Sequence, residues 1–443
     1  MEFTGKNLLV CGLARSGQAA ARLLKDLGAI VTLQDKNQDK KEDFDKEGFK
    51  GFKFFLGKNP DDIVGEFDLI VISPGISVYE PFVKKAQSMG IPVWGEAELA
   101  FLFCPCPMIA ITGTNGKTTV TTLVGDILKL YNPKTVIAGN IGIPLTGLVT
   151  GLDKSCIVVA EISSFQLETI AAFRPIISAV LNMTPDHLDR HLTMENYIAA
   201  KSRIFENQRQ DDICVLNYDN EITKVMQPPS KVVYFSTKDV NDVDEVMVFI
   251  RDGCIYSRLS GSDEFIVDTS ELKIMTENAL AVTALTLCAG VPIELITKGL
   301  KDFCGIEHRL EYVATINNVE YYNDSKATNI DSTIKALETF NKPVTLICGG
   351  YDKKADFTPL VELFSQKVAN AIVIGQTTNQ IISTCDTLGF TKYERAETLK
   401  EAVELASKGG FTILFSPACA SLDMFKNFEE RGDLFKEYVL ELY

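Results

Sequence analysis

Short apolar runs rich in β-branched residues alternate with segments of helical periodicity along most of this chain. Near the N-terminus, a strand predicted from Asn7 to Cys11 precedes a helix from about Ser16 to Leu27. A second strand runs from Ile30 to Leu33 and ends near Asp35, and a later strand runs from Asp68 to Ile72. Strands separated by helices in this way are typical of parallel sheets with crossover helices, so we expect an α/β fold.

The same alternation predicts a second unit that begins with the strand Met108 to Thr112. A glycine-rich loop and a long helix from Lys117 to about Leu130 come next, and strands at Ile157 to Ile162 and Ser178 to Asn182 continue the sheet. The region from Ile213 to Gly261 is β-rich but more irregular in its pattern. We expect a central α/β unit with the glycine-rich loop at the end of its first strand.

A third unit is predicted from strands at Val344 to Cys348, Ala371 to Ile374 and Thr412 to Phe415. Each strand ends in Gly or in Ser-Pro and precedes a helical segment, which is the pattern of a doubly wound sheet that binds ligands at its carboxyl edge. At roughly 150 residues per domain, the length of 443 residues predicts about three domains. We place these domains at residues 1–96, 97–305 and 306–443.

Charge and composition limit the classes of ligand. The chain has 44 Lys and Arg against 59 Asp and Glu, a formal net charge of −15, so we expect no nucleic-acid partner. Its 11 cysteines include no Cys-x-x-Cys pair, and it has three histidines, which favours the reduced thiols of a cytoplasmic protein over disulfides or structural zinc. We find no signal peptide and no apolar run of about 18 residues, so we expect no membrane insertion.

A glycine-rich loop joins the first strand of the central unit to its long helix. Its sequence is Thr112-Gly113-Thr114-Asn115-Gly116-Lys117-Thr118-Thr119. Glycines let successive N–H groups face one anion, and the helix N-terminus adds partial positive charge. Lys117 can then reach the outer phosphates of a nucleotide, and Thr118 can ligate Mg²⁺. The strict phosphate-loop spacing has Gly where this chain has Ile111, so the loop is a variant, and the alternative is a helix-capping loop with a surface lysine.

Candidate metal ligands follow the next strands of the central unit. Glu161 ends an apolar strand, and polar residues cluster after it up to Glu168. A carboxylate there suits Mg²⁺, although an acid in this position can also cap a helix. His187 and His191 are four residues apart, as in a zinc protease, but Leu188 stands where such an enzyme has Glu, so we reject that class. A histidine at a strand end can also be purely structural.

Lys201 lies in a helical stretch with apolar neighbours. One interpretation is a surface lysine whose aliphatic stem covers apolar side chains. The other is a desolvated amine with a lowered pKa. Such a neutral amine can react with CO₂, and the resulting carbamate would be an anionic metal ligand.

The turn after the first strand has the sequence Gly12-Leu13-Ala14-Arg15-Ser16-Gly17. Asp35 follows about 20 residues later, as in turns that bind NAD. The pattern is weak because Ala14 stands in place of the middle glycine.

These segments together resemble the Mur ligase family over essentially the whole chain. The shared segments are Gly113-Thr114-Asn115-Gly116-Lys117-Thr118, the strand ending at Glu161, the Asp186-His187 loop, Lys201, Glu307-His308-Arg309 and Asn323-Asp324-Ser325-Lys326-Ala327-Thr328-Asn329. The most discriminating segments are Ser416-Pro417-Ala418-Cys419-Ala420-Ser421-Leu422-Asp423 and Phe425-Lys426-Asn427-Phe428-Glu429-Glu430-Arg431-Gly432. This C-terminal run is similar to the branch of the family that adds D-glutamate.

The resemblance implies a Rossmann-like N-terminal domain for a UDP-linked substrate, a P-loop-type central ATPase domain and a Rossmann-like C-terminal domain for an amino acid. It implies that the catalytic residues are Lys117, His187 and Lys201. It implies ATP contacts from Gly113, Thr114, Asn115, Gly116, Lys117, Thr118, Thr119, Asn278, Arg309, Asp324 and Lys326. For the UDP part it implies Arg15, Ser16, Asp35, Lys36, Ser73, Gly75 and Asn140. For D-glutamate it implies Thr328, Lys353, Ser421, Leu422 and Phe428.

The resemblance also implies two Mg²⁺ ions, one held by Thr118 and Glu161 and the other by His187 and Lys201, the lysine carrying a CO₂-derived carbamate. The implied substrates are ATP, D-glutamate and UDP-N-acetylmuramoyl-L-alanine. ATP would convert the carboxylate of the UDP-linked substrate to an acyl-phosphate, and D-glutamate would then be joined to it during peptidoglycan precursor synthesis. We expect a cytoplasmic monomer whose domains close around these substrates.

Three other functions stay open at this point. A folylpolyglutamate synthase would share the phosphate loop and the carbamylated lysine but not the Ser416 to Asp423 run. An NAD-dependent oxidoreductase would use the Gly12 to Gly17 turn. A non-catalytic nucleotide switch would bind ATP without amino-acid-dependent phosphate release.

Overall fold

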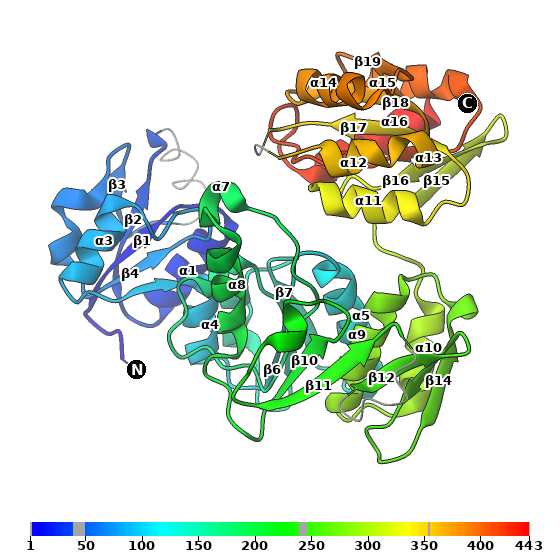
Figure 1. Cartoon of the computed structure of the whole chain (residues 1–443). Helices are drawn as coiled ribbons and strands as arrows, with labels where there is room; N and C mark the ends of the chain where they lie inside the picture. The colour runs from blue at the N-terminus through cyan, green and yellow to red at the C-terminus, as the bar shows by residue number, and fades with distance from the viewer. Residues whose placement is uncertain (1, 39–48, 239–245, 353–354, 443) are drawn as a thin grey trace. The chain divides into compact units, whose positions relative to one another are not determined.

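The computed structural model describes residues 2–38, 49–238, 246–352 and 355–442 (Figure 1). Contacts divide the chain into two compact units, Met1–Phe303 and Cys304–Tyr443. Among the described residues, two β-sheets belong to the first unit and one to the second, and helices connect most of the parallel strands. This arrangement confirms the α/β class.

The first sheet lies at the N-terminus and is wholly parallel. Its strands are β1 (Asn7–Cys11), β2 (Ile30–Asp35), β3 (Lys53–Leu56), β4 (Leu69–Ile72) and β5 (Val93–Gly95), in the order β3-β2-β1-β4-β5. The helices of this region are α1 (Arg15–Asp26), α3 (Pro81–Ser88) and α4 (Glu96–Phe103). The strand order reverses between β1 and β4, so the loops after these two strands meet where α/β sheets bind ligands.

The second sheet has nine strands in the order β14-β13-β12-β11-β10-β9-β6-β8-β7. The strands are β6 (Met108–Thr112), β7 (Thr135–Gly139), β8 (Ile157–Glu161), β9 (Ile177–Val180), β10 (Ile213–Asn217), β11 (Lys231–Ser236), β12 (Val246–Arg251), β13 (Cys254–Ser257) and β14 (Glu264–Asp268). Strands β6 to β12 pair in parallel, and β13 and β14 pair antiparallel at one edge.

The described part of the region from Ile213 to Gly261 is β-rich as predicted, and the register of β11 on β12 shifts between Tyr234 and Phe235. Strands β10 and β11 run in continuous parallel register, from Ile213 beside Lys231 to Asn217 beside Phe235. Their connection contains the single-turn 3₁₀ helix η7 (Thr223–Val225) instead of an α-helix. The sequence therefore lacks the helical periodicity that marks the other crossovers.

Helices cover both faces of the second sheet. They are α5 (Lys117–Tyr131), α6 (Ser164–Leu167), α7 (Leu188–His191), α8 (Met194–Ser202), α9 (Thr276–Cys288) and α10 (Ile293–Asp302). Helix α5 packs against α9 and α10. Buried residues of α5, among them Val120 and Ile127, share one apolar core with Leu285 and Leu300. Further 3₁₀ turns are η2 (Pro60–Asp62), η3 (Val64–Glu66), η4 (Leu145–Gly147), η5 (Val149–Gly151), η6 (Arg203–Phe205) and η8 (Thr269–Glu271).

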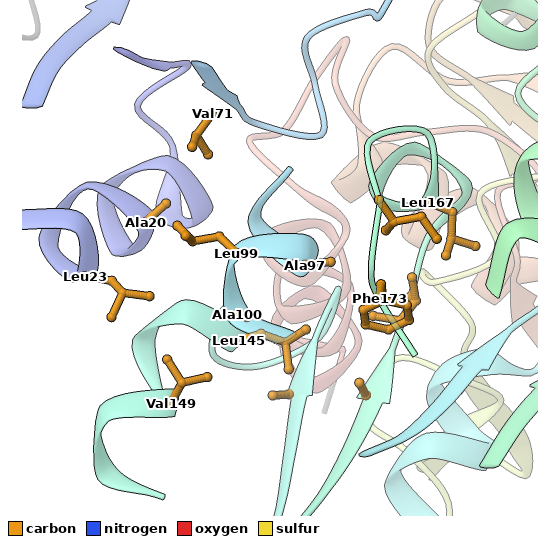
Figure 2. Packing of buried hydrophobic residues seen from close by; sticks show 14 of the residues in the cluster. Ala20, Leu23, Val71, Ala97, Leu99, Ala100, Leu145, Val149, Leu167 and Phe173 are labelled. Atoms are coloured by element: carbon orange, nitrogen blue, oxygen red, sulfur yellow. The ribbon is translucent and has the colours of Figure 1, made fainter. Parts of the chain in front are cut away.

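Helix α4 joins the first two sheets into one unit. It contacts α1, η4, η5 and α6. Figure 2 shows Leu99 of α4 beside Ala20 of α1, with Leu145 and Phe173 of the neighbouring region in the same cluster. Leu99 is fully buried, and burying such a side chain contributes about 2 kcal/mol. This continuous apolar core explains why the first 303 residues form one compact unit.

The sheet of the second unit has six strands in the order β15-β16-β20-β17-β18-β19. The strands are β15 (Glu311–Ile316), β16 (Val319–Asn323), β17 (Val344–Gly349), β18 (Val368–Ile374), β19 (Tyr393–Arg395) and β20 (Ile413–Phe415). The helices are α11 (Ile330–Glu338), α12 (Thr358–Glu362), α13 (Phe364–Lys367), α14 (Thr378–Leu388), α15 (Leu399–Ala406) and α16 (Phe428–Leu440), with the 3₁₀ turn η9 (Ser407–Gly409). Among the described strands of this sheet, β15 and β16 pair antiparallel and the other neighbours pair in parallel, so the carboxyl ends of β16 to β20 share one edge.

Candidate active site

The glycine-rich loop lies between β6 and α5, as predicted. Gly113 has φ of 152° and Gly116 has φ of 83°, both in the region that favours glycine. A side chain on Gly116 would collide with the Asn278 amide oxygen. The close approach of Asn278 therefore requires glycine at this position, where the loop leads into the N-terminus of α5, the end of a helix that favours an anion.

Asn182, the second residue after β9, forms hydrogen bonds with the glycine-rich loop. Its amide oxygen accepts from the Asn115 N–H at 2.8 Å, and its amide nitrogen donates to the Asn115 carbonyl at 3.2 Å. The Asn182 carbonyl also accepts from the Thr114 N–H at 3.0 Å. The sequence predicted Asn182 as the last residue of a strand and predicted no functional role for it. A polar side chain just beyond a buried strand was the signal that could have marked it.

Lys117 begins α5 and folds back over the loop. Its Nζ atom donates to the Gly113 carbonyl at 2.9 Å and to the Thr114 carbonyl at 2.7 Å. The surface-lysine alternative does not describe this arrangement. The cation is instead poised at the rim of the cradle where the outer phosphates of a nucleotide would lie.

Glu161 lies at the end of β8 and is nearly fully buried. The Thr118 hydroxyl donates to its Oε2 atom at 2.7 Å, and the Asn140 amide donates to its Oε1 atom at 2.9 Å. A hydroxyl, a carboxylate and an amide thus gather beside the phosphate loop, and such oxygen donors suit a hard cation such as Mg²⁺. The structure places Asn140 at this cluster, although the resemblance had assigned it to the UDP part.

His187 has the left-handed conformation, with φ of 54°, just before α7. Its N–H donates to the Asp186 Oδ1 atom at 2.9 Å, and its ring Nε2 atom lies 3.6 Å from Asp186 Oδ2. The side chain is 34% exposed, so the ring can reach a ligand. A non-glycine residue in this conformation is uncommon and occurs at functional sites, which favours a role beyond packing.

His191 points elsewhere and is buried. Its Nε2 atom lies 3.0 Å from the Ser164 hydroxyl, and its Nδ1 atom lies 3.5 Å from Glu168 Oε1. Burial, and next the charge of Arg190, lower its pKa to about 4. The two histidines therefore differ in environment, in agreement with our rejection of a zinc protease.

Lys201 lies on α8 and is 2% exposed, which excludes a surface lysine. Its Nζ atom donates to the Gly113 carbonyl at 2.7 Å and to the Thr112 hydroxyl at 3.3 Å. Burial, and next the charge of Lys117, hold the pKa of the Lys201 amine well below its usual range. Asp186 and Glu161 act in the opposite direction. The buried position beside the phosphate loop therefore favours the neutral form of this amine.

A separate cavity of about 200 Å³ lies at the switch point of the first sheet. Its lining includes Gly12, Asp35, Lys36, Gly75 and Ile76. Asp35 shapes the turn, because its Oδ2 atom accepts from the Leu13 N–H at 2.8 Å.

Of the residues predicted for the UDP part, Asp35, Lys36 and Gly75 are thus brought together in this cavity. Ser73 lies beneath it, and its hydroxyl donates to the Gly12 carbonyl at 2.5 Å. Arg15 and Ser16 form the first turn of α1, outside this lining.

In the second unit, Asp324 lies just after β16 and is buried. It accepts from the Ser416 hydroxyl at 2.7 Å and from the Leu310 N–H at 3.2 Å. Burial raises the pKa of Asp324 to about 6, against the opposing charges of Arg309 and Arg431. Its protonation therefore changes close to neutral pH.

Arg431 links the Asp324 loop to the C-terminal run. Its guanidinium donates to the Ser325 carbonyl at 2.7 Å and to the Cys419 carbonyl at 3.0 Å. Phe428 accepts at its carbonyl from the Ser325 hydroxyl at 2.8 Å, and its ring lies 4.8 Å below the Lys326 ammonium. Lys326, predicted for ATP, and Phe428, predicted for D-glutamate, are thus in direct contact in the second unit.

The other residues predicted to contact D-glutamate are Ser421, Leu422, Thr328 and Lys353. Ser421 is buried, and its carbonyl accepts from the Phe425 N–H at 2.9 Å, whereas the neighbouring Leu422 is 65% exposed. Thr328 lies between β16 and α11. Lys353 lies outside the described residues.

A glycine-bent phosphate loop with buried oxygen ligands beside it defines a P-loop-type nucleotide-binding protein. Comparison with known proteins extends this class. The sequence patterns of the Mur ligase MurD-like N-terminal domain, the Mur ligase middle domain and the Mur ligase glutamate ligase domain match residues 6–95, 111–285 and 308–419. The chain belongs to the Mur ligase family, whose members are ATP-dependent ligases, and this confirms the resemblance seen in the sequence.

Full-length relatives give a more specific comparison. A protein from Thermoanaerobacter sp. is 45% identical, and one from Caldicellulosiruptor bescii is 44% identical, each over 100% of this chain and 99% or more of its own length. Both are named UDP-N-acetylmuramoylalanine–D-glutamate ligase.

Solved structures agree on the fold. The UDP-N-acetylmuramate–alanine ligase of Thermotoga maritima has a TM-score of 0.59 at 18% identity, over 99% of this chain and 100% of its own. A pseudomurein peptide ligase type C from Methanothermus fervidus has a TM-score of 0.58 at 18% identity, with the same coverage. The three-domain α/β architecture that we predicted is therefore confirmed. No helix in the described part of the chain is long and apolar enough to cross a membrane.

Proposed function

We propose that the protein uses ATP to join D-glutamate to UDP-N-acetylmuramoyl-L-alanine, a step of peptidoglycan precursor synthesis. Full-length identity of 41 to 45% to relatives named for this reaction carries the proposal. The geometry supports it, because the phosphate loop, a buried carboxylate and a buried amine meet at one edge of the second sheet.

In this mechanism, the substrate carboxylate attacks the γ-phosphate of ATP and ADP leaves. The D-glutamate amine then attacks the acyl-phosphate, and phosphate leaves as the amide forms. The protein contributes mainly positioning and charge neutralisation. Lys117 would exchange its loop carbonyls for the outer phosphates, while the N-terminus of α5 holds the remaining charge.

The oxygen ligands around Glu161 fit Mg²⁺, which when bound would neutralise the phosphate charge. We assign Thr118 and Glu161 to one ion, and His187 and Lys201 to a second. Asn140 orients the Glu161 carboxylate from the other side, since its amide donates to the oxygen that Thr118 leaves free.

We further propose that Lys201 acts as a carbamate. Its neutral amine attacks CO₂ at carbon, the new N–C bond forms and one proton is released to solvent, which leaves an anionic oxygen donor. The buried position and lowered pKa of the amine support this step, because an ammonium cation has no lone pair for the attack.

The other assignments follow the same proposal. The nucleotide would contact Asn278 in the first unit and Arg309, Asp324 and Lys326 in the second. The D-glutamate pocket would be formed by Thr328, Lys353, Ser421, Leu422 and Phe428. The UDP part would occupy the cavity with Asp35, Lys36 and Gly75, near Arg15, Ser16 and Ser73. We propose that the enzyme is a cytoplasmic monomer.

Phosphate release tests the function directly. The enzyme is supplied with ATP, UDP-N-acetylmuramoyl-L-alanine and, in turn, a panel of D- and L-amino acids. We expect release that depends on D-glutamate, and a loss of about 100-fold or more in kcat for Lys117→Ala but not for the exposed Lys129→Ala on the same helix. Release that depends instead on a folate and L-glutamate, or no release at all, would overturn the proposal.

A further inference from the structure

Arg190, on α7, lies between the loop of the UDP cavity and the loop of the metal ligand His187. Its Nη1 atom donates to the Pro74 carbonyl at 2.7 Å, and its Nη2 atom donates to the Ile76 carbonyl at 2.9 Å. Gly75, between these carbonyls, lines the cavity together with Ile76. The guanidinium therefore fixes the backbone of a cavity wall from outside the cavity.

The same guanidinium is fixed on its other side by the metal-binding region. Its Nη2 atom also donates to Glu168 Oε2 at 2.5 Å, and its carbon lies 4.3 Å above the Phe165 ring. That ring meets the His187 ring edge-on, with centroids 4.8 Å apart, and stacks on His191 at 5.5 Å. The surface that supports the His187 ring is thus held by Arg190.

The arrangement needs a guanidinium instead of any cation. The planar guanidinium donates to two carbonyls and one carboxylate and also stacks on an aromatic ring. The single ammonium group of lysine cannot make all of these contacts at once. The Arg190 and Glu168 side chains are 12% and 8% exposed, so neither charge can turn to solvent without leaving the other buried and unpaired.

We propose that Arg190 is a positioning residue that ties the substrate loop at residues 73–76 to the His187 loop, so that the UDP-linked substrate binds with its acyl end set toward the metal site. The inference rests on the proposed function and deepens it. Arg190 touches neither reactant in this account and acts through the two loops that do.

The role of Arg190 can be tested without turnover by calorimetric measurement of UDP-N-acetylmuramoyl-L-alanine binding in the absence of ATP. Because Arg190→Met removes both carbonyl bonds, we expect its Kd, and its KM for this substrate, to rise about tenfold. The KM values for ATP and D-glutamate should change by less than about twofold, and Arg190→Lys should recover part of the loss. Arg174→Met is the matched control, because Arg174 forms a comparable ion pair with Asp212 that does not involve residues 73–76.

An unchanged Kd and KM in Arg190→Met would overturn the proposal, and so would equal losses for all three substrates, which would indicate general damage to the fold. If the unaltered enzyme showed no D-glutamate-dependent phosphate release, the proposed function would fail, and the binding measurement would still decide the role of Arg190.

Phe165→Leu provides a second route if Arg190→Met does not fold. It removes the ring between the guanidinium and His187 and leaves the bonds to residues 74 and 76. We expect kcat to fall while the Kd of the UDP-linked substrate stays within about twofold. An increased Kd with an unchanged kcat would contradict the proposal that residues 73–76 affect substrate binding and the His187 loop affects the catalytic step.

Discussion

Two ionisable side chains, Lys201 and Asp324, are buried so deeply that their surroundings decide their charge. Burial favours the neutral form of each, so it lowers the pKa of the lysine and raises that of the aspartate to about 6. Each side chain is held by a hydrogen bond: Lys201 donates to the Gly113 carbonyl, and Asp324 accepts from the Ser416 hydroxyl. Each therefore gives a prediction that a surface residue of the same type would not.

For Lys201, the prediction concerns a covalent change. With ¹³C-labelled bicarbonate, the enzyme should show a carbamate carbonyl signal in its ¹³C spectrum, because the neutral amine can attack CO₂. Lys201→Ala should lose the signal and about 100-fold in kcat, since an anionic ligand is removed. Full kcat in Lys201→Ala at low Mg²⁺ would contradict the carbamate role.

For Asp324, the prediction concerns stability. Its folded pKa of about 6 exceeds the usual value of 3.8, so the folded state binds the proton more tightly than the unfolded state. The linkage relation then gives a negative slope, and stability is lost as the pH rises through the folded pKa. Between pH 5.5 and 7.5 this group should remove about 1 kcal/mol from the free energy of unfolding.

Calorimetry of the unaltered protein and Asp324→Asn at several pH values in this range checks the sign. The difference in free energy of unfolding between the two proteins should change by about 1 kcal/mol. Parallel pH profiles would show that Asp324 does not titrate there.

At the scale of elements, α4 couples the first two sheets through buried acids as well as apolar contacts. The Glu98 carboxylate accepts from three consecutive N–H groups, those of Ala171, Ala172 and Phe173, at 2.8 to 2.9 Å. These donors follow α6 and do not belong to regular secondary structure. The carboxylate therefore holds a turn that regular hydrogen bonding does not.

We expect Glu98→Ala to lower the free energy of unfolding by about 2 to 4 kcal/mol, because it leaves three N–H groups without their charged acceptor. Chemical denaturation of the first unit, followed by the fluorescence of Trp94, measures this loss. Glu294→Ala, an exposed acid in the first turn of α10, is the control and should cost far less. Equal losses in both variants would show that Glu98 does not specifically stabilise the turn at residues 171–173.

The sequence predicted strands and helices well because apolar periodicity acts locally. It placed the phosphate loop between its strand and helix, and Glu161 at a strand end, for the same reason. It could not predict contacts that depend on the packing of distant segments, such as the bonds from Arg190 to residues 74 and 76. Asn140 is a further example, because its approach to Glu161 depends on the pairing of β7 with β8.

At the scale of the whole molecule, the proposed contacts are divided between two compact units. Phosphate-loop residues belong to the first, and Asp324, Lys326 and the proposed D-glutamate pocket belong to the second. In the proposed mechanism, the D-glutamate amine in the second unit must therefore reach the acyl-phosphate formed at the phosphate loop of the first. An acyl-phosphate also needs protection from water, which favours closure around bound ligands.

We expect the radius of gyration in solution scattering to decrease when a non-hydrolysable ATP analogue, Mg²⁺ and the UDP-linked substrate are added together. The substrate alone should give a smaller change, since its proposed cavity lies within the first unit. Identical scattering profiles with and without ligands would count against closure.

The carbonyl oxygen of Gly113 accepts from both Lys117 and Lys201. A nucleotide that draws the Lys117 ammonium away would take a repelling charge from beside Lys201 and bring phosphate anions near, and both effects stabilise an ammonium there. CO₂ uptake should therefore precede nucleotide binding in the working cycle. Enzyme preincubated with bicarbonate should then start without a lag, whereas enzyme first saturated with ATP in CO₂-free buffer should start slowly.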